Sequence, residues 1–427
     1  MSTQDPTGTP TNSADQLSSP ARKRSGTVSA GVAIAIAVVL LLVGIGGGYF
    51  LGTSLNKSTS TSTSQVQLTE TGSSLLYPLM TRWGGNYSVA TVSAASTGSG
   101  TGQSDAELGL VNIGASDGYL ANASVTSLIN LPVAISAQLI YYNLPGITAH
   151  LNLNGTVLAM IYNGTITTWN NPMILAAQPT AVQTQLGALS SEQIHPIKRS
   201  DSSGDTFLFT SLCYMSWSQW SYGFSTSALT GDTVATGATG NSGVVSALQS
   251  TTNSIGYVGI SYESSANGDG LHYAALGNND TIANGTYAAA AADYILPSAS
   301  NISADANLGL THLEFSTYQL AVSLILGGSP AGAIDLLHGG GGTNPAAGTS
   351  PYPDVNLEYT LIKTAPTGPT VTSTALAATV QFLEWAISNG NWAPGSLPSA
   401  YINAVSFIPL TPEVTGYDMQ ELASVQP

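Results

Sequence analysis

Charged residues are scarce in this chain. They make up 7% of its 427 residues, against about 25% in an average soluble protein. The hydrophobic content of 43% is still enough to build a core, which excludes a disordered chain. The surface must therefore be solvated mainly by the hydroxyl and amide groups of Ser, Thr and Asn.

Basic residues are the scarcest group. Eight Lys and Arg stand against 23 Asp and Glu, which gives a formal net charge of −15. Beyond residue 64 the only basic residues are Arg82, Lys198, Arg199 and Lys363. Nucleic-acid binding depends on a basic surface, so no nucleic-acid partner is expected.

Cysteine and metal-binding patterns are also lacking. The single Cys213 excludes an intramolecular disulfide and a cysteine-based zinc site, and no cysteine near the N-terminus could carry a lipid. We expect Cys213 to be a small buried apolar residue. The five histidines show no metal-binding spacing. No metal and no other cofactor are therefore expected.

A long apolar run is present near the N-terminus. Residues 28–51 carry no charge and follow the basic cluster Arg22-Lys23-Arg24, and about 20 apolar residues suffice to cross a bilayer. The basic flank favours a cytoplasmic N-terminus. We therefore expect a cytoplasmic tail (1–27), a single-pass transmembrane anchor (28–52) and a Ser/Thr-rich flexible linker (53–65), with the rest of the chain on the extracytoplasmic side of the cell membrane. A cleaved signal peptide is the alternative, although its apolar core is usually shorter.

Asn-x-Ser/Thr sequons after the apolar run suggest a glycoprotein. The chain is rich in these residues, so several sequons would arise by chance and they support an exterior location only weakly. They begin at Asn56, Asn86, Asn122, Asn154, Asn163, Asn279, Asn284 and Asn301.

Short β-branched runs alternate with helical stretches beyond the linker. This interleaving predicts an α/β architecture with mainly parallel sheets. The predicted strands are Val89–Ala95, Leu110–Gly114, Leu139–Asn143, His195–Arg199, Ile255–Ile260 and Leu357–Lys363. The predicted helices are Leu75–Asn86, Thr206–Trp217 and Thr374–Ser388.

Three Gly/Ser-rich segments lie where a strand gives way to a helix. They are Thr71–Leu75, Thr97–Gly102 and Arg199–Thr206. A helix N-terminus offers unpaired N–H groups and a partial positive charge, and small residues let an anion approach closely. One such segment is ordinary turn and capping chemistry, but three together favour an anion site.

Two charged residues accompany these segments. Arg199 is one of only two arginines beyond the apolar run, and a guanidinium suits a tetrahedral oxyanion. The other, Arg82, falls within a predicted helix and is expected at the surface or in a salt bridge. A fourth segment, Asn112–Gly118, places Asp117 after a short apolar strand. A carboxylate repels an anion unless the ligand carries a proton that it can accept, and phosphate carries such protons where sulfate does not.

These segments resemble the phosphate-binding receptors of ABC phosphate transporters, most closely the mycobacterial-type branch. The similar motifs occur in family order and span about residues 66–427. They are Gly72–Leu79, Thr97–Gly102, Asn112–Asp117, Ala134–Gln138, Tyr142–Gly146, Arg199–Phe207 and Ser254–Val258.

The resemblance implies a two-lobed α/β periplasmic-binding-protein fold of the class II type, with the ligand in a cleft between the lobes; the expected transmembrane helix would precede it. Residues 66–143 and 352–427 would form lobe one, and residues 144–351 lobe two. The resemblance also implies high-affinity binding of inorganic phosphate and delivery to an ABC permease and ATPase. No catalysis is expected, and the ectodomain should be monomeric.

The resemblance further implies the phosphate ligands. They are Ser74, the backbone N–H of Leu75, Ser99, Asp117, Arg199, Ser203, Gly204 and Asp205. Many members have Thr where this chain has Asp205, so its role is left open between a second proton acceptor and a partner that orients Arg199. Ser202, where relatives commonly have Gly, and the anchor helix depart from the family without touching the donors.

Other functions are also compatible with the sequence, among them a surface protein that keeps this fold but senses or scavenges phosphate without a transporter. Another tetrahedral oxyanion, such as sulfate, arsenate or molybdate, could be the ligand. A serine hydrolase is less favoured: Gly114–Gly118 matches a nucleophile motif with Ser116 as the nucleophile, and residues 338–341 match an oxyanion loop. In those enzymes the glycine loop precedes the nucleophile, whereas here it follows, and His338 is the last histidine.

Overall fold

The computed structural model describes residues 65–118, 120, 127–189, 192–277, 294–311, 351–390 and 401–427, all within the unit Gln65–Pro427. The expected tail, anchor and nearly all of the linker lie outside the described residues, as do His338 and the sequons at Asn56, Asn122, Asn279 and Asn284. No helix in the described part of the chain is long and apolar enough to span a membrane.

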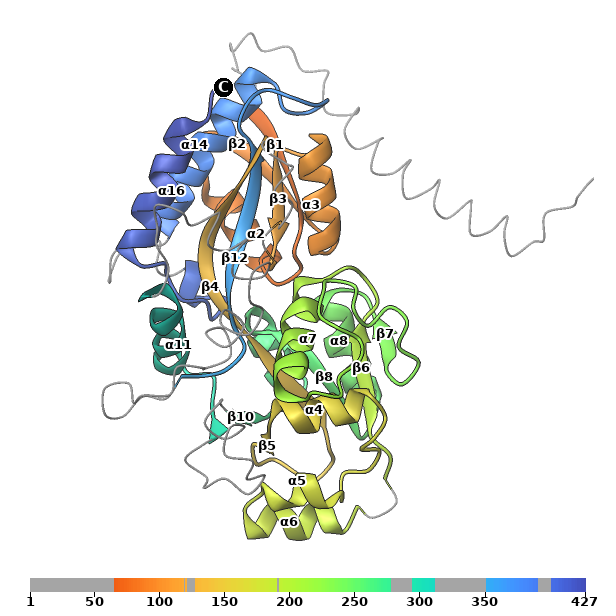
Figure 1. The fold of residues 1–427 in the computed structure, drawn as a ribbon. Coiled ribbons are helices and arrows are strands. Elements are labelled where there is room, and N and C mark those ends of the chain that lie inside the picture. Colours follow the sequence, from red (N-terminus) through yellow and green to blue (C-terminus); the bar gives the residue numbers. More distant parts are fainter. Residues whose placement is uncertain are drawn as a thin grey trace, which may run out of the picture. The chain divides into compact units, whose positions relative to one another are not determined.

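One large sheet runs through the unit Gln65–Pro427 (Figure 1). Its strand order is β2-β1-β3-β12-β4-β8-β6-β7, and β9 pairs with β4 off this path. These strands are β1 (Val66–Gly72), β2 (Ala90–Ser96), β3 (Ile113–Ser116), β4 (Leu128–Asn143), β6 (His195–Arg199), β7 (Thr236–Ala238), β8 (Ser254–Gly259), β9 (His272–Tyr273) and β12 (Val355–Lys363). A smaller sheet has the order β11-β10-β5, from Tyr294–Ile295, Ala275–Gly277 and Asn152–Leu153.

Strand β4 connects two parts of the large sheet. It pairs with β12 through Ala137 and with β8 from Gln138 onward. We call β2, β1, β3, β12 and Leu128–Ala137 the first half-sheet, and Gln138–Asn143, β8, β6 and β7 the second half-sheet. The sheet is mixed rather than mainly parallel as predicted, because β12 returns between β3 and β4 and runs opposite to both.

Helices pack on both half-sheets (Figure 1). Helices α2, α3 and α14 contact strands of the first half-sheet, and α7 and α8 contact strands of the second. The helices are α2 (Tyr77–Asn86), α3 (Ser99–Leu108), α4 (Gly155–Tyr162), α5 (Pro172–Ala176), α6 (Thr180–Gly187), α7 (Gly204–Ser216), α8 (Gly240–Ser250), η1 (Ile260–Tyr262), α9 (Glu263–Gly268), α11 (Ala299–Thr311), α14 (Ser373–Gly390) and α16 (Pro412–Ser424).

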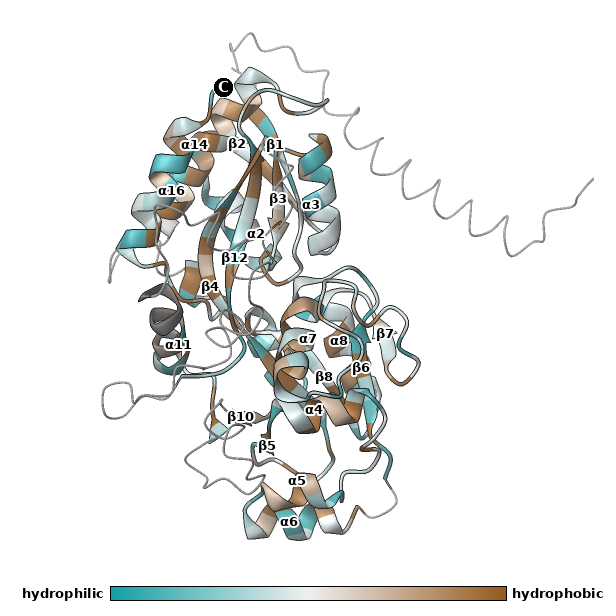
Figure 2. Ribbon diagram, viewed as in Figure 1, coloured by the Kyte–Doolittle hydropathy of each residue, from teal (hydrophilic) through white to brown (hydrophobic). Residues whose placement is uncertain are grey.

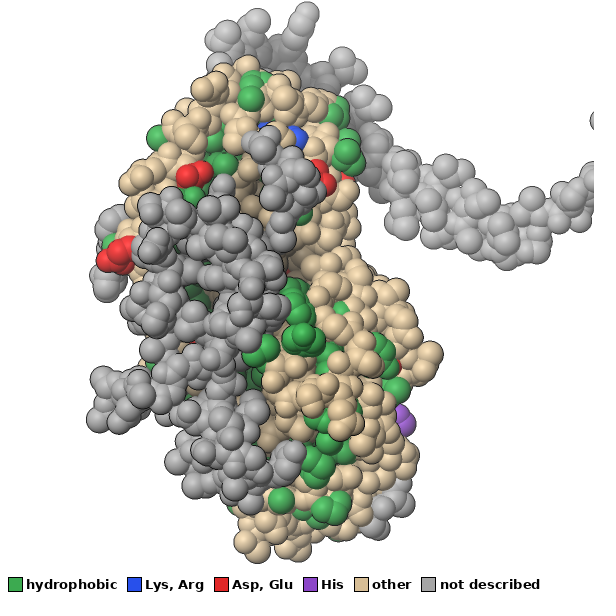
Figure 3. All heavy atoms as spheres, viewed as in Figure 1, with side chains coloured by type: hydrophobic (Ala, Val, Ile, Leu, Met, Phe, Trp, Pro, Cys, Tyr) green, Lys and Arg blue, Asp and Glu red, His purple; other side chains and the backbone are tan. Residues whose placement is uncertain are grey.

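Apolar side chains of the strands and helices form a continuous core. Figure 2 shows the hydrophobic colour along the central strands, while the helices alternate between hydrophobic and hydrophilic residues. Cys213 is buried in this core, as expected. On the face drawn in Figure 3, the described side chains are mostly uncharged, and only a few are acidic or basic. This agrees with the low charge content of the sequence.

Glycines let α3 lie close against the first half-sheet. A Cβ at Gly114 would lie 2.3 Å from the carbonyl oxygen of Gly102 and 2.8 Å from the Cβ of Ala106. A Cβ at Gly102 would lie 2.4 Å from the carbonyl oxygen of Ala115. Only glycine fits at this crossing, so the position of Ser99 at the start of α3 depends on it.

Several carboxylic acids are buried in the unit Gln65–Pro427. Glu70 in β1 is 2% exposed, and Asp354 and Asp418 are fully buried. Burial raises the pKa of Glu70 to about 8 and raises the pKa values of Asp354 and Asp418 well above their ordinary range. The neutral forms of these acids are therefore favoured in the folded protein.

We predict that the free energy of unfolding falls as the pH rises from about 5 to about 8. A pKa that is raised on folding contributes stability that is fully present below the unfolded pKa and is lost as the pH rises through the folded pKa. For each such acid, the free energy of unfolding falls by roughly 1.4 kcal/mol per pH unit between the pKa of the unfolded state and that of the folded state. Urea titrations of the ligand-free protein across this range measure the effect, and a stability that rises instead would contradict it.

We also predict that Gly114→Ala destabilises the protein by about 1–3 kcal/mol, because the added methyl group forces α3 away from β3. Gly85→Ala is the matched control, since a Cβ at Gly85 in α2 meets nothing within 4 Å. It should stabilise the protein by roughly 0.4–1 kcal/mol. Urea midpoints of the two variants measure this, and equal effects would refute the packing argument.

Candidate functional site

The N-terminal turns of four helices meet where the two half-sheets face each other. Gly204 N–H, at the start of α7, donates to Ser99 Oγ at the start of α3 at 3.1 Å. Asn241 N–H in α8 donates to Ser74 Oγ, in the turn that leads into α2, at 3.1 Å. Helix N-termini carry partial positive charge and orphan N–H donors. Their convergence creates a position suited to an anion.

The order of the elements explains this convergence. Helices α2, α3, α7 and α8 each follow a strand directly: β1, β2, β6 and β7. These strands pair in parallel within their own half-sheets, so their carboxyl ends lie at the same edge. Ligands of open α/β sheets bind outside those ends.

The turn between β1 and α2 contributes two serines. Ser74 is buried, and its Oγ accepts from both the backbone N–H and the side-chain amide of Asn241, the latter at 3.0 Å. Ser73, which sequence reasoning did not single out, donates its hydroxyl to Asp117 and accepts from Leu76 N–H at 2.8 Å. The carbonyl of Leu75 accepts from Ser261 Oγ at 2.7 Å. The turn after β1 of the first half-sheet therefore contacts residues that follow strands of the second half-sheet, Asn241 after β7 and Ser261 after β8.

Asp117 lies at the centre of the contacts between α3 and α7. Ser99 Oγ donates to Asp117 Oδ2 at 3.2 Å. A Cβ at Gly204 would lie 2.3 Å from the Cβ of Asp117, so only glycine allows α7 to begin there. Ser203 caps α7 by accepting from Asp205 N–H at 3.1 Å. These contacts bring together four of the predicted site residues: Ser99, Asp117, Ser203 and Gly204.

Arg199 is the one basic residue in this cluster of described residues. It is 4% exposed, and its guanidinium forms ion pairs with Asp201 and Asp205. Burial alone would lower the pKa of Arg199, but the hydrogen bond to Asp201 and the charges of Asp205 and Asp201 raise it. The guanidinium therefore stays charged. Arg82, by contrast, is exposed on α2.

Asp205 joins α7 to Arg199, β4 and α8. Besides its ion pair, it accepts from the amide of Asn241 at 2.8 Å and, through its backbone carbonyl, from the amide of Gln138 at 2.8 Å. Burial and then the charge of Asp117 raise the pKa of Asp205 to about 7, against the opposing effect of Arg199. Asp205 both orients Arg199 and titrates near neutral pH, so both roles left open by the sequence are compatible with its position.

Asp117 has a second acid beside it. Glu358 in β12 is fully buried, and its carboxyl group lies beside that of Asp117. Burial and the charge of Asp117 raise the pKa of Glu358 well above its ordinary value. Burial also raises the pKa of Asp117, which hydrogen bonds from Ser73, Glu358 and Ser99 and the charge of Arg199 lower in part.

Sequence reasoning missed four residues of this network: Ser73, Asp201, Asn241 and Glu358. Ser73 and Asp201 lie inside segments that it had selected. Asn241 follows a short strand in the Gly-rich stretch 236–243, which has the same character as the selected segments, so a signal existed. Glu358 lies within a predicted strand, and no local pattern shows that it faces Asp117.

Ser116 lacks the surroundings of a catalytic nucleophile. Its hydroxyl donates to the carbonyl of Gly118 and accepts from the amide of Gln103 at 3.0 Å. These are the contacts of a turn, and no imidazole is among its described partners. The geometry gives no support to the hydrolase alternative.

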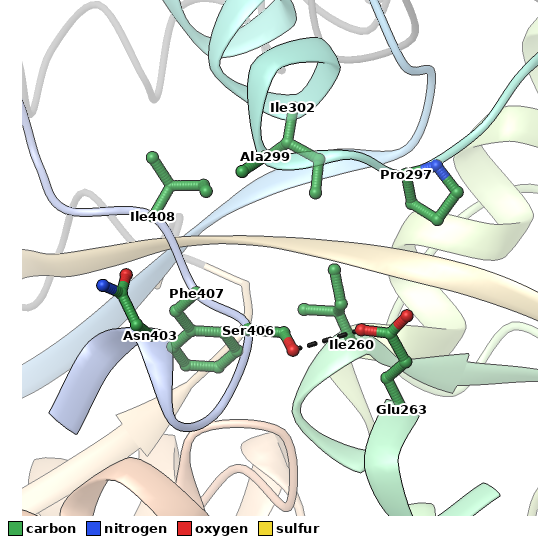
Figure 4. Close-up of a pocket in the computed structure, with 9 residues that line it drawn as sticks. All are labelled: Ile260, Glu263, Pro297, Ala299, Ile302, Asn403, Ser406, Phe407 and Ile408. Carbon is green, nitrogen blue, oxygen red and sulfur yellow. Dashed lines mark hydrogen bonds between the residues drawn. The ribbon is translucent and has the colours of Figure 1, made fainter. Parts of the chain in front are cut away.

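A cavity of about 300 Å³ lies elsewhere, beside α11, η1 and residues 403–408 (Figure 4). Its lining combines apolar side chains with Glu263, Asn403 and Ser406, and Glu263 accepts from Ser406 Oγ at 3.1 Å. The carboxylate and the absence of basic residues from its lining make it unsuitable for an anion. The cavity is therefore separate from the cluster around Arg199.

Comparisons with known proteins agree with this fold. A family profile described as "PBP superfamily domain" matches residues 57–389. The phosphate-binding protein PstS of Xylella fastidiosa (strain 9a5c) is 27% identical over 82% of this chain and 83% of its own length. The Pasteurella multocida protein of the same name is 31% identical over 57% of this chain and 69% of its own length. A solved phosphate-binding protein from Stenotrophomonas maltophilia shares the fold with a TM-score of 0.53 and 18% identity, over 83% of this chain and 93% of that one.

The branch within the family is a separate question. Mycobacterial relatives match over a smaller share of this chain than the Xylella and Pasteurella proteins do, so the expected mycobacterial-type branch is not specifically favoured. The profile and the sequence matches together establish that the chain belongs to the PBP superfamily and, within it, to the PstS-type phosphate-binding proteins of ABC transporters.

Proposed function

We propose that this chain binds inorganic phosphate outside the cytoplasm and delivers it to an ABC permease and its ATPase, as a receptor and not an enzyme. The observation that carries the proposal is a buried guanidinium, Arg199, set among four converging helix N-termini in a PstS-type protein. A guanidinium offers paired charge-assisted hydrogen bonds to an oxyanion, and N–H groups add donors without further charge.

The residues that we propose to bind phosphate are those inferred from the sequence. Contacts that join Ser74, Ser99, Asp117, Arg199, Ser203, Gly204 and Asp205 into one network support the set. The N–H of Leu75 is retained because it belongs to the same turn as Ser74. We add Asn241, because its amide contacts both Ser74 and Asp205.

The half-sheets are proposed to belong to two lobes that close on the ligand, with lobe one at residues 66–143 and 352–427 and lobe two at 144–351. The exchange of partners by β4 between Ala137 and Gln138 supports a crossing between the lobes within β4, but it puts Gln138–Asn143 with the second half-sheet, earlier than the predicted boundary at residue 143. A second crossing just before β12 is supported by the hydrogen bond from Gln138 N–H to the backbone carbonyl of Asp354 at 2.9 Å. Binding proteins of two lobes close by hinge motion.

The anchor at 28–52, the single-pass location and glycosylation rest on the sequence. Among the described sequons, Asn154 is unsuitable for a glycan, because it is 4% exposed and its side chain caps α4 by accepting from Val157 N–H at 2.9 Å. Asn86 is exposed at the end of α2 and remains a candidate. Assignment to the mycobacterial-type branch rests on the resemblance of the sequence motifs and stays a prediction, as does a monomeric ectodomain.

Another oxyanion is the alternative ligand. Sulfate carries no proton near neutral pH and would leave Asp117 facing its charge, so the site disfavours it. Molybdate is disfavoured for the same reason. Arsenate matches phosphate in charge and protonation and would meet the same donors and acceptor.

We predict that phosphate binds up to about 10⁴-fold more tightly than sulfate, because the acceptor carboxylate is left unpaired by an anion without a proton. Asp117→Asn should narrow this difference. Isothermal titration with both anions measures it, with Asp269→Asn as the control, since Asp269 is exposed at the end of α9. Equal affinities for the two anions, or no binding of phosphate, would overturn the proposal.

Arg199→Ala should weaken phosphate binding by roughly 2–5 kcal/mol, because it removes the charged partner of a buried anion. Arg82→Ala removes the other described arginine, which is exposed, and should leave the affinity as in the wild type. Titration calorimetry of both variants, with circular dichroism to confirm folding, tests this pair. Similar losses in the two variants would mean that Arg199 is not the ligand.

A further inference from the structure

Glu358 occupies a position directly behind Asp117. Strand β12 pairs with β3 so that Tyr359 lies opposite Ser116, the residue before Asp117. Asn356, on the same side of β12 as Glu358, donates its amide to the carbonyl of Asp117. The two acids are thus held together by the sheet, and both are at most 1% exposed.

The hydrogen bonds of Glu358 leave one of its oxygens available. Oε1 accepts from Ser136 Oγ at 2.6 Å and from the amide of Asn356 at 3.3 Å. Oε2 receives no N–H or O–H from the described residues. Two adjacent buried carboxylates cannot both stay ionised. The pair is therefore favoured with one proton, and Glu358 Oε2, which accepts no hydrogen bond from the described residues, is the oxygen available to carry it.

We propose that Glu358 is a positioning residue that holds a proton against Asp117 and thereby links phosphate binding to pH. This inference rests on the proposed function. With the proton on Glu358, the pair carries one negative charge, and Asp117 remains an acceptor for a phosphate hydroxyl. When the O–H bond of Glu358 breaks and the proton passes to solvent, the pair carries two negative charges and opposes the anion.

Other charged groups around Asp117 and Glu358 affect the pH at which the pair titrates. Asp205 on α7 faces both acids with a like charge, and Arg199 at the end of β6 acts on Asp117 with the opposite charge. Burial and then the charge of Asp205 raise the pKa of Asp354, which lies before β12. Burial and the charge of Asp117 raise the pKa of Glu358 well above its ordinary value and so favour its protonated form. The pKa of Asp205 is also raised, to about 7, so an experiment has to distinguish its contribution from that of Glu358.

Glu358→Gln provides this separation. The glutamine amide keeps the size of the side chain and offers an N–H to Asp117 at every pH. Phosphate titrations in two buffers of different ionisation enthalpy, from about pH 6 to about pH 9, give both the affinity and the protons exchanged. We expect the wild type to take up protons on binding at alkaline pH and the variant to take up fewer. Above the pKa of Glu358, each pH unit should weaken phosphate binding by up to about tenfold through this group in the wild type. The variant should lack this part of the pH dependence.

Two further measurements keep the proposal falsifiable. Glu263→Gln is the matched control, because Glu263 hydrogen-bonds to Ser406 outside the cluster, and it should behave as the wild type. Infrared spectra of the phosphate-free protein at neutral pH should lose one protonated carboxyl band in Glu358→Gln. Equal proton uptake in wild type and variant, or no band lost, would overturn the inference. Failure of the wild type to bind phosphate would refute the proposed function, while the infrared result would still locate the proton.

Discussion

The ion pairs of Arg199 with Asp201 and Asp205 are the interaction on which the site depends. The guanidinium is almost completely buried, where an unpaired charge would be very costly. The same two carboxylates hold the helices in place, because Asp201 accepts from Gly240 N–H at 3.0 Å and Asp205 accepts from the Asn241 amide. The pairing that keeps Arg199 charged therefore also places the start of α8 beside the start of α7.

A site for an anion with more carboxyl groups than cations needs an electrostatic explanation. Asp117, Asp201, Asp205 and Glu358 surround a single guanidinium. The pKa of Asp201 is lowered: burial acts against this, but the hydrogen bond and charge of Arg199 outweigh it. The pKa values of the other three are raised, so these acids take up protons more readily than ordinary carboxyl groups and need not all be ionised together. Protonation therefore reduces the negative charge, and helix N-termini supply much of the positive potential without needing further basic residues. This suits a chain with so few of them.

Much of the fold could be predicted from the sequence, and the site in part. Strand β6 has the predicted bounds, and α2, α7 and α14 differ from their predictions only near their ends. Strand β4 was predicted as Leu139–Asn143 but begins at Leu128, because it is buried on both faces and shows no alternation to mark its start. The loops of the candidate site were recognisable because glycine, serine and a rare arginine are local signals. Glu358 was not, since its partner lies 241 residues earlier in the chain and only the register of β12 against β3 brings them together.

Strand β4 also ties the arrangement of the half-sheets to the charges of the site. Gln138 is the first residue of β4 that pairs with β8. Its side-chain amide donates to the backbone carbonyl of Asp205, and its backbone carbonyl accepts from Tyr352 Oη at 2.9 Å. A rotation of the half-sheets about this point would change the separation of Asp117, from the first half-sheet, and Asp205, from the second. Repulsion between these two acids raises the pKa of Asp205, and it weakens as they separate. A closing rotation would therefore favour proton uptake at Asp205, and by linkage a proton taken up there would favour that rotation.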